Sequence, residues 1–287
     1  YKLAYELEHD TQGSTTLEIH SHPKGRSVWV DGEKVTRLVD FIGRFPSVTL
    51  CSSDLMLLRG SPSERRRFMD LALSVVNRDY YTALRDFHCG IAERNRLLKN
   101  SGSTAELSAF EAEIAPHASQ IASYREAGMR SLSEVLCRTY DRIAEADEGP
   151  ELSFRPNVDC HDTEAYCRLL HDSRKRDQMI GATQRGPHRD DFNFSLQVGG
   201  AREYASDGQQ RGLCVALRIA QASFYRERLG IVPVLLADDV LGELDPIRRQ
   251  GFWRACPEDV QVVATGTELP AEPQNWSIYK VLSGQIR

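Results

Sequence analysis

The first fifty residues alternate apolar and polar side chains with the period of two that is typical of β-strands. Residues 2–8 and 15–20 follow this pattern, and 48–51 is a further strand candidate. Residues 28–35 contain an Asp-Gly pair, which suits a tight two-residue turn because both residues tolerate positive φ angles. We therefore expect a meander of antiparallel strands.

The apolar spacing then changes to that of an α-helix. Residues 62–147 are rich in charge and are interrupted by Ser-Gly-Ser-Thr at 101–104, so they predict two long helices folded back as an antiparallel arm. Residues 151–180 mix a short strand with a charged helix. The later segments are a strand at 192–198, a helix at 208–229, a strand at 233–238, a helix from Pro246, a strand at 260–264 and a last strand near 277–282. Such alternation favours a parallel α/β core.

Composition narrows the class of protein. The chain has 287 residues, of which 41% are hydrophobic and 27% charged, and these are values of a soluble globular protein. No apolar run approaches the ~20 residues that span a bilayer, so we expect no membrane partner. Seven scattered cysteines without a Cys-x-x-Cys pair favour reduced thiols in the cytoplasm. A net charge of −5 argues against coating nucleic acid through bulk positive charge, but a local basic patch stays compatible with it.

Two adjacent carboxylates, Asp238 and Asp239, follow the apolar run 234–237. A buried strand that brings acids to the edge of a sheet is how nucleotide hydrolases hold Mg²⁺ and polarise a water. We assign Asp238 as the metal ligand and Asp239 as the residue that orients or deprotonates the attacking water. The simpler alternative is a pair of solvated acids at a strand end.

A second motif, Ser-Asp-Gly-Gln-Gln, opens the predicted helix at 208–229. Its serine, Ser206, can be a plain helix N-cap. A helix N-terminus with free N–H groups, a glycine and a hydroxyl is also an anion site. Ser206, Gly208 and Gln209 are therefore candidates for binding phosphate.

The order of these two motifs resembles the ATP-binding-cassette (ABC) ATPases, and their details resemble the DNA-repair branch that includes RecF and the SMC heads. Residues 55–70, 94–99 and 186–192 resemble RecF segments in order and spacing, and the arm is too short for the long coiled coils of SMC proteins. The resemblance implies an α/β fold: an ABC-ATPase head, made of an antiparallel β meander plus a parallel α/β core, with an inserted helical lobe. The implied divisions are 1–60 for the first part of the ATPase lobe, 61–180 for the helical lobe and 181–287 for the second part of the ATPase lobe.

The resemblance also implies roles for residues. The Ser206 segment would bind the γ-phosphate of an ATP held by the opposite protomer. Asp245 would lie in the D-loop that crosses the dimer interface, with an N-cap before Pro246 as the alternative. Relatives place a γ-phosphate-sensing His after the strand at 260–264; Thr-Gly-Thr stands there in this chain, and we assign the role to Thr267, with Thr265 as the alternative.

One family motif is absent from the sequence. The chain contains no Gly-x-x-x-x-Gly-Lys-Ser/Thr loop, whose backbone cradles phosphates. The family carries this loop upstream of the strands that open this chain, and the first residue here is Tyr1, so we expect the loop to precede it. We expect slow ATPase activity from the intact protein and little ATP binding by this chain alone.

The function implied is ATP-dependent DNA binding in bacterial replication, recombinational repair and the SOS response. The protein would dimerise around ATP and Mg²⁺, bind duplex DNA and single-strand/duplex junctions, and act with RecR, RecO and RecA at gaps. The run Arg65-Arg66-Arg67 is a candidate DNA contact, because guanidinium groups bind phosphates bidentately. Its alternative is a solvated helix face paired with nearby acids.

Two other functions remain open at this point. A transporter-type ABC subunit would usually carry Leu-Ser-Gly-Gly-Gln and a switch His, and neither is present. A non-hydrolysing scaffold with a degenerate ABC head would not need Ser206, Asp238 and Asp239, although the absent phosphate loop is compatible with it.

Overall fold

The chain divides into two compact units in the computed structural model, each built from separate stretches of sequence. The structure describes residues 1–9, 13–23, 25–144, 147–257, 259–267, 276–283 and 285–286. The first unit consists of Tyr1–Pro46, Asp70–Tyr124 and Asp159–Arg185; the second consists of Ser47–Met69, Arg125–Val158 and Gly186–Arg287. Two helices, α2 (Pro62–Val76) and α4 (Thr104–Ala144), run from one unit into the other.

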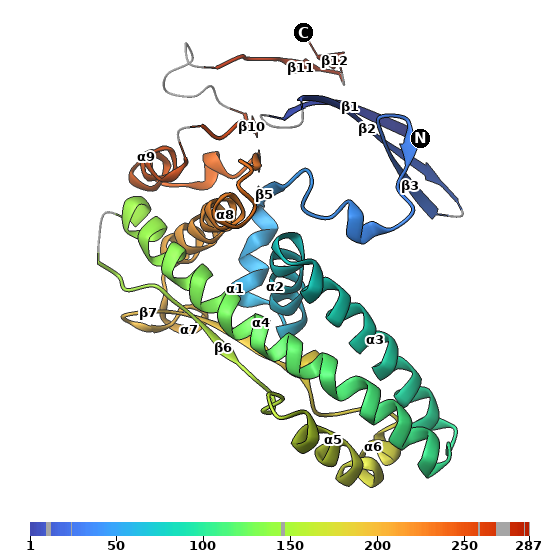
Figure 1. Ribbon diagram of the computed structural model, residues 1–287. Helices are drawn as coiled ribbons and strands as arrows, with labels where there is room; N and C mark the ends of the chain where they lie inside the picture. Colours follow the sequence, from blue (N-terminus) through green and yellow to red (C-terminus); the bar gives the residue numbers. More distant parts are fainter. Residues whose placement is uncertain are drawn as a thin grey trace. The chain divides into compact units, whose positions relative to one another are not determined.

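The predicted meander opens the first unit (Figure 1). Its four antiparallel strands are β1 (Lys2–His9), β2 (Gly13–His22), β3 (Gly25–Val30) and β4 (Glu33–Lys34). The Asp-Gly turn is confirmed: Asp31 and Gly32 have φ angles of +50° and +80°, the left-handed values that this turn needs. Leu17 and Val30 face each other across the β2–β3 pair and are both buried.

The predicted break in the helical arm is also confirmed, because α3 (Arg78–Lys99) ends just before it and α4 begins at Thr104. Within the first unit α3 lies against the first part of α4 so closely that a Cβ atom on Gly90 would lie 2.6 Å from Ile114. The prediction of two long helices was wrong in one respect. The stretch 62–99 forms two helices, because Asn77 leaves the helical conformation and caps α3 by accepting a hydrogen bond from the Tyr80 N–H.

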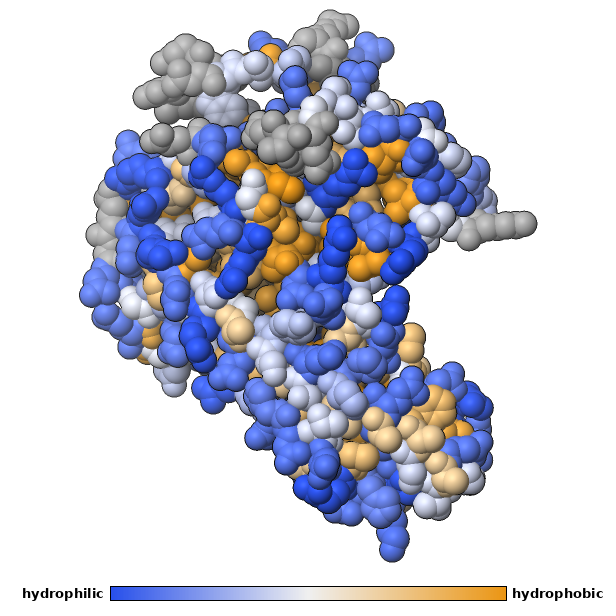
Figure 2. All heavy atoms as spheres, in the orientation of Figure 1, coloured by the Kyte–Doolittle hydropathy of each residue, from blue (hydrophilic) through white to orange (hydrophobic). Residues whose placement is uncertain are grey.

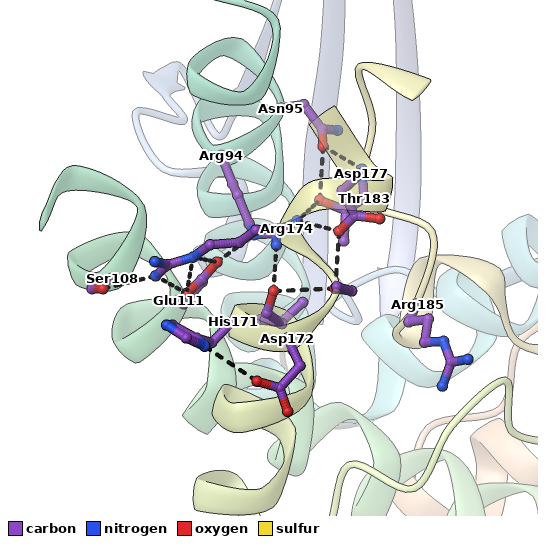
Figure 3. A network of polar contacts seen from close by, with 12 residues as sticks. Arg94, Asn95, Ser108, Glu111, His171, Asp172, Arg174, Asp177, Thr183 and Arg185 are labelled. Atoms are coloured by element: carbon purple, nitrogen blue, oxygen red, sulfur yellow. Dashed lines mark hydrogen bonds and ion pairs between the residues drawn. The ribbon is translucent and has the colours of Figure 1, made fainter. Parts of the chain in front are cut away.

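A buried polar network holds the arm to α5 (Thr163–Asp172) and α6 (Arg174–Ile180). Arg94 of α3 is fully buried, and its guanidinium donates to Glu111 at 3.1 Å and to Asp177 at 2.8 Å. Arg174 also donates to Glu111, at 3.0 Å from its Nε (Figure 3). Two buried cations therefore face two buried acids, which avoids the large cost of an unpaired charge in the interior.

The second unit contains a parallel three-stranded sheet, which confirms the predicted parallel core. Its strands are β5 (Ser47–Cys51), β9 (Val234–Asp238) and β10 (Val262–Thr265), in the order β10-β9-β5. The prediction that 48–51 belongs to the antiparallel meander was wrong, because this strand pairs in parallel with Val234–Asp238 instead. Helix α8 (Asp207–Leu229) packs against β5, and α9 (Pro246–Ala255) packs against α8. The core between sheet and helices is made of short aliphatic side chains: Val48, Leu50, Leu213, Leu217, Leu235 and Ala237.

A second sheet in this unit is antiparallel and joins β6 (Glu151–Arg155), β7 (Asp191–Leu196) and β8 (Gly199–Gly200). Phe154 stacks on Phe192 on its buried face, with ring centroids 5.4 Å apart. The other short elements are η1 (Leu38–Asp40), η2 (Ser52–Leu55), α1 (Met56–Arg59), η3 (Pro187–Arg189), α7 (Ala201–Tyr204), η4 (Leu241–Glu243), β11 (Val281–Leu282) and β12 (Gln285–Ile286). The last predicted strand is thus confirmed only over its final two residues.

The surface in view is mixed, with hydrophilic side chains predominating and hydrophobic side chains gathered in patches between them (Figure 2). None of the helices in the described segments combines the length and the apolar content needed to cross a membrane.

Candidate functional site

The two candidate catalytic acids stand at the carboxyl end of β9, the central strand of the parallel sheet. Asp238 is the last residue of the strand, and both Asp238 and Asp239 are exposed. Asp239 has a φ of +54°, a left-handed conformation that Asp tolerates better than most residues. The chain therefore turns sharply as soon as it leaves the sheet, at the edge where parallel α/β folds bind ligands.

A threonine on the neighbouring strand holds this pair of acids. Thr265 ends β10 and is the register partner of Asp238. Its hydroxyl donates to Asp238 Oδ1 at 2.8 Å and accepts from the Asp239 N–H at 3.1 Å. Thr267, our first choice as the switch residue, is exposed; among the described contacts no hydrogen bond joins it to either acid. The geometry brings Thr265 to the acids.

A pocket lies beside this edge, between the end of β5, helix α8 and the segment that follows the acids. Glu243 holds that segment in place: it accepts from Ser52 Oγ at 3.0 Å and forms an ion pair with Arg211 of α8. The apolar part of the lining comes from Leu50, Leu55, Val215, Val240 and Leu244.

Ser206 is the N-cap of α8, which is the simpler of its two predicted roles. Its hydroxyl accepts from the Gln209 N–H at 3.3 Å, while the Gln209 side chain accepts from the Ser206 N–H at 2.8 Å. This reciprocal pair is a capping box. Because the Ser206 hydroxyl only accepts here, its own proton is still available to another acceptor. Ser206 is exposed, so a ligand can reach it.

Asp245 is likewise the N-cap of α9. It also binds Arg248, a residue that the sequence analysis did not single out. It accepts from the Arg248 N–H at 3.0 Å and from the Arg248 guanidinium at 2.8 Å. These backbone and side-chain hydrogen bonds hold the pKa of Asp245 below its usual range. The Arg248 side chain lies across the start of α8, where a Cβ atom on Gly212 would be 2.9 Å from its Nε. In the sequence, this close approach is indicated only by two glycines one helical turn apart, Gly208 and Gly212, which leave room for a side chain against α8.

The predicted residues thus form two groups. Asp238 and Asp239 are joined through Thr265, and the starts of α8 and α9, with Ser206, Gly208 and Asp245, are joined through Arg248. No hydrogen bond or ion pair in the described part of the chain links one group to the other.

The three adjacent arginines differ in their surroundings. Arg65 is buried and donates to both carboxylate oxygens of Asp191, at 2.8 and 2.9 Å. Burial raises the pKa of Asp191, but the hydrogen bonds from Arg65 and the Phe192 N–H, together with the positive charges of Arg65 and Arg66, outweigh burial, and the pKa is lowered. Arg66 is half-buried and donates to the Asp190 carbonyl at 2.7 Å. Arg67 is exposed, so it is the most accessible of the three.

Comparisons with known proteins identify the family, although no protein-family model matches the chain. The DNA replication and repair protein RecF of Moorella thermoacetica is 33% identical over 271 residues, which cover 93% of this chain and 72% of that protein. The RecF of Streptococcus suis is 30% identical over 289 residues, covering 98% and 79%. The RecF of Heliobacterium modesticaldum is 31% identical over 271 residues, covering 90% and 73%.

Solved structures show the same fold. The recombination mediator protein RecF with ATPrS matches with a TM-score of 0.86 at 24% identity, covering 99% of this chain and 79% of the other. RecF with ATP matches with a TM-score of 0.85 at 22% identity, covering 100% and 79%. The fold is therefore that of the RecF ABC-ATPase head, and the chain belongs to the RecF family of DNA replication and repair proteins.

Proposed function

We propose that the protein is an ATP-dependent DNA-binding protein of recombinational repair, which dimerises around ATP on DNA and promotes RecA loading at gaps together with RecO and RecR. The observation that carries the proposal is the pair of exposed acids, Asp238 and Asp239, at the carboxyl end of the central parallel strand and held by Thr265. Its RecF relatives are named for DNA replication and repair, which supports the choice of DNA as the ligand.

The cofactors proposed are ATP and Mg²⁺. Carboxylate oxygens are the hard ligands that Mg²⁺ prefers, and Asp238 offers one in an exposed position with its orientation fixed by a hydroxyl. When bound, the ion neutralises charge on the β and γ phosphates. Asp239 accepts a proton from the attacking water or orients it, and we expect turnover to be slow.

The dimer contacts proposed are on the starts of α8 and α9. Ser206 donates its free hydroxyl proton to a γ-phosphate bound by the other protomer, while Gly208 and Gln209 present the positive end of the helix. Asp245 lies at the protomer interface, and Thr267 is the proposed γ-phosphate sensor. We keep the lobe boundaries 1–60, 61–180 and 181–287 and the cytoplasmic location as parts of the proposal.

The three arginines of the basic run, residues 65–67, have different roles in the proposed DNA binding. Arg66 and Arg67 contact phosphates, because both are at least partly exposed. Arg65 joins α2 to β7 through its partly buried pair with Asp191, so a phosphate contact by Arg65 would require that pair to break.

The test is ATP-dependent DNA binding by the full-length gene product, measured by fluorescence anisotropy beside ATP hydrolysis. Asp239→Asn should still bind ATP, but it should hydrolyse it at least about 10²-fold more slowly, since a positioned base contributes about 10²–10⁴-fold. The variant should therefore stay on DNA for longer. Asp141→Asn, the same change on the exposed side of α4, is the control and should behave as wild type. Normal turnover by Asp239→Asn would remove Asp239 from the mechanism.

A further inference from the structure

Three arginines from separate segments meet at the turn that leads into β7. Arg155 ends β6 and is the register partner of Asp191, the first residue of β7. Residues directly opposite in an antiparallel pair project from the same face of the sheet. Arg189 lies two residues before Asp191, in η3. Arg66 reaches the turn from α2 by donating to the Asp190 carbonyl at 2.7 Å.

The two acids at this turn are already neutralised by other arginines. Asp190 is only 2% exposed and accepts from Arg125 at 2.7 Å. Asp191 accepts a hydrogen bond on each carboxylate oxygen from Arg65, and a further one from the Phe192 N–H. The turn thus carries five arginines and two aspartates, an excess of three positive charges in a chain whose net charge is −5. A local field of this kind attracts a polyanion whatever the sign of the total charge.

Arg155 and Arg189 are the side chains at this turn with the most freedom to bind a ligand. Both are exposed, and among the described contacts neither has an ion pair. Their backbones are held by the pairing of Arg155 with Asp191 and by the hydrogen bond from the Arg189 N–H to the Gly186 carbonyl, while their side chains are exposed and can adjust to a ligand. A guanidinium binds two phosphate oxygens in a planar fork.

The other residues on this face of the sheet indicate which kind of polyanion the face can bind. The residues that share the face with Arg155 and Asp191 are Glu151, Ser153, Asn193 and Ser195, because the alternate positions Leu152, Phe154, Phe192 and Phe194 project from the other face. The face therefore has no aromatic or aliphatic anchor of the kind that protein interfaces depend on, and no ring on which a base could stack. Charge without apolar anchors is typical of contacts to a nucleic-acid backbone, which position DNA without specifying its sequence.

We propose that Arg66, Arg155 and Arg189 form a binding surface for the phosphate backbone of DNA at the turn into β7. The proposal rests on the proposed function, DNA binding, and adds a specific site to it. It also separates the arginines at the turn by role: Arg65 and Arg125 neutralise its acids, and the other three face the ligand.

The test is the salt dependence of DNA binding by the full-length gene product with Mg-ATP, measured with a fluorescent duplex. We expect the double variant Arg155→Ala/Arg189→Ala to bind more weakly and to reduce the slope of log K against log salt by about 1.8, because each lost phosphate contact removes about 0.9. The matched control is Arg130→Ala/Arg138→Ala, which removes the same charge from side chains on α4 that are 71% and 65% exposed. The control should keep the wild-type slope.

Three outcomes of this experiment bear on the proposed DNA-binding surface. A reduced slope in the Arg155/Arg189 variant alone supports the site. An unchanged slope in that variant, or an equal reduction in both variants, overturns it, since binding would then use another surface or only the total charge. A wild-type protein that does not bind DNA would instead refute the proposed function, and the site with it. Melting temperatures of both variants should match that of the wild type, because none of the four side chains is buried.

Discussion

The hydroxyl of Thr265 lies between the two residues on which the proposed chemistry depends. It donates to the carboxylate of Asp238 and accepts from the backbone of Asp239, so one small group fixes the proposed metal ligand and the backbone of the proposed base. Asp239 has a left-handed conformation, and the hydrogen bond that its N–H donates to the Thr265 hydroxyl helps to hold that conformation.

We expect Thr265→Val to lower ATP turnover or apparent Mg²⁺ affinity by about 10–100-fold, as loss of a partner of a metal ligand typically does. Valine keeps the shape of threonine but cannot donate or accept. Thr265→Ser keeps the hydroxyl and should recover most of the loss. The measurement is the Mg²⁺ dependence of ATP turnover in the full-length gene product. Equal behaviour of the valine and serine variants would mean that the hydroxyl does not position the acids.

The cap at Asp245 gives a pH-dependent prediction. Its folded-state pKa is lowered by hydrogen bonds from Arg248, so its contribution to stability is fully present above its unfolded pKa of about 3.9 and disappears as the pH falls through the lower folded value. Asp245→Ala should lose about 1 kcal/mol of unfolding free energy at pH 7. Asp245→Asn keeps an acceptor and should lose less. Denaturant unfolding across pH is the measurement, and a deficit of Asp245→Ala that grows rather than shrinks below pH about 4 would contradict this assignment.

At the scale of elements, residues that are adjacent in sequence have different roles because they project from different faces of the same helix. Arg65 projects inward from α2 to Asp191 on β7, while Arg67 projects to solvent. The sequence shows three equivalent basic residues. Their difference depends on which face of α2 packs against β7, and that contact joins residues 126 positions apart.

Arg65→Met should therefore destabilise the protein, by about 2–4 kcal/mol, because it leaves Asp191 without its cation in a partly buried place. The same change at Arg67 is the control, and as a surface substitution it should stay within about 0.5 kcal/mol of wild type. Chemical denaturation measures both. Equal stability of the two variants would show that the Arg65–Asp191 pair does not hold α2 to β7.

Local patterns predicted most elements, and the exceptions have physical causes. The Asp-Gly turn and the break at 101–104 depend on nearby residues, and both are confirmed. The strand at 48–51 was placed in the meander because its parallel pairing with β9 joins residues far apart in the sequence. The break at Asn77 was missed because no Gly or Pro marks it; the stop comes from a side-chain cap. Arg248 was missed because its contacts with Gly208 and Gly212 join two helices.

At the scale of the whole molecule, the chain builds two units from interleaved segments, with α2 and α4 shared between them. The buried network around Arg94 supports one unit, and the parallel sheet with its acids supports the other. Relatives in the RecF family match nearly the whole chain, both units included. The proposed dimer requires a second copy of this molecule, because the starts of α8 and α9 are assigned to the ATP of the other protomer.

The most direct test of ATP-dependent dimerisation is light scattering of the full-length gene product with and without Mg-ATP, for the wild type, Ser206→Arg and Ser206→Ala. Both variants lose the helix cap, but only arginine places a bulky side chain where a phosphate must approach. We predict that the wild type changes from monomer to dimer with ATP, that Ser206→Arg stays monomeric, and that Ser206→Ala dimerises more weakly than wild type but more than Ser206→Arg. ATP-driven dimerisation of Ser206→Arg as strong as that of wild type would contradict this prediction.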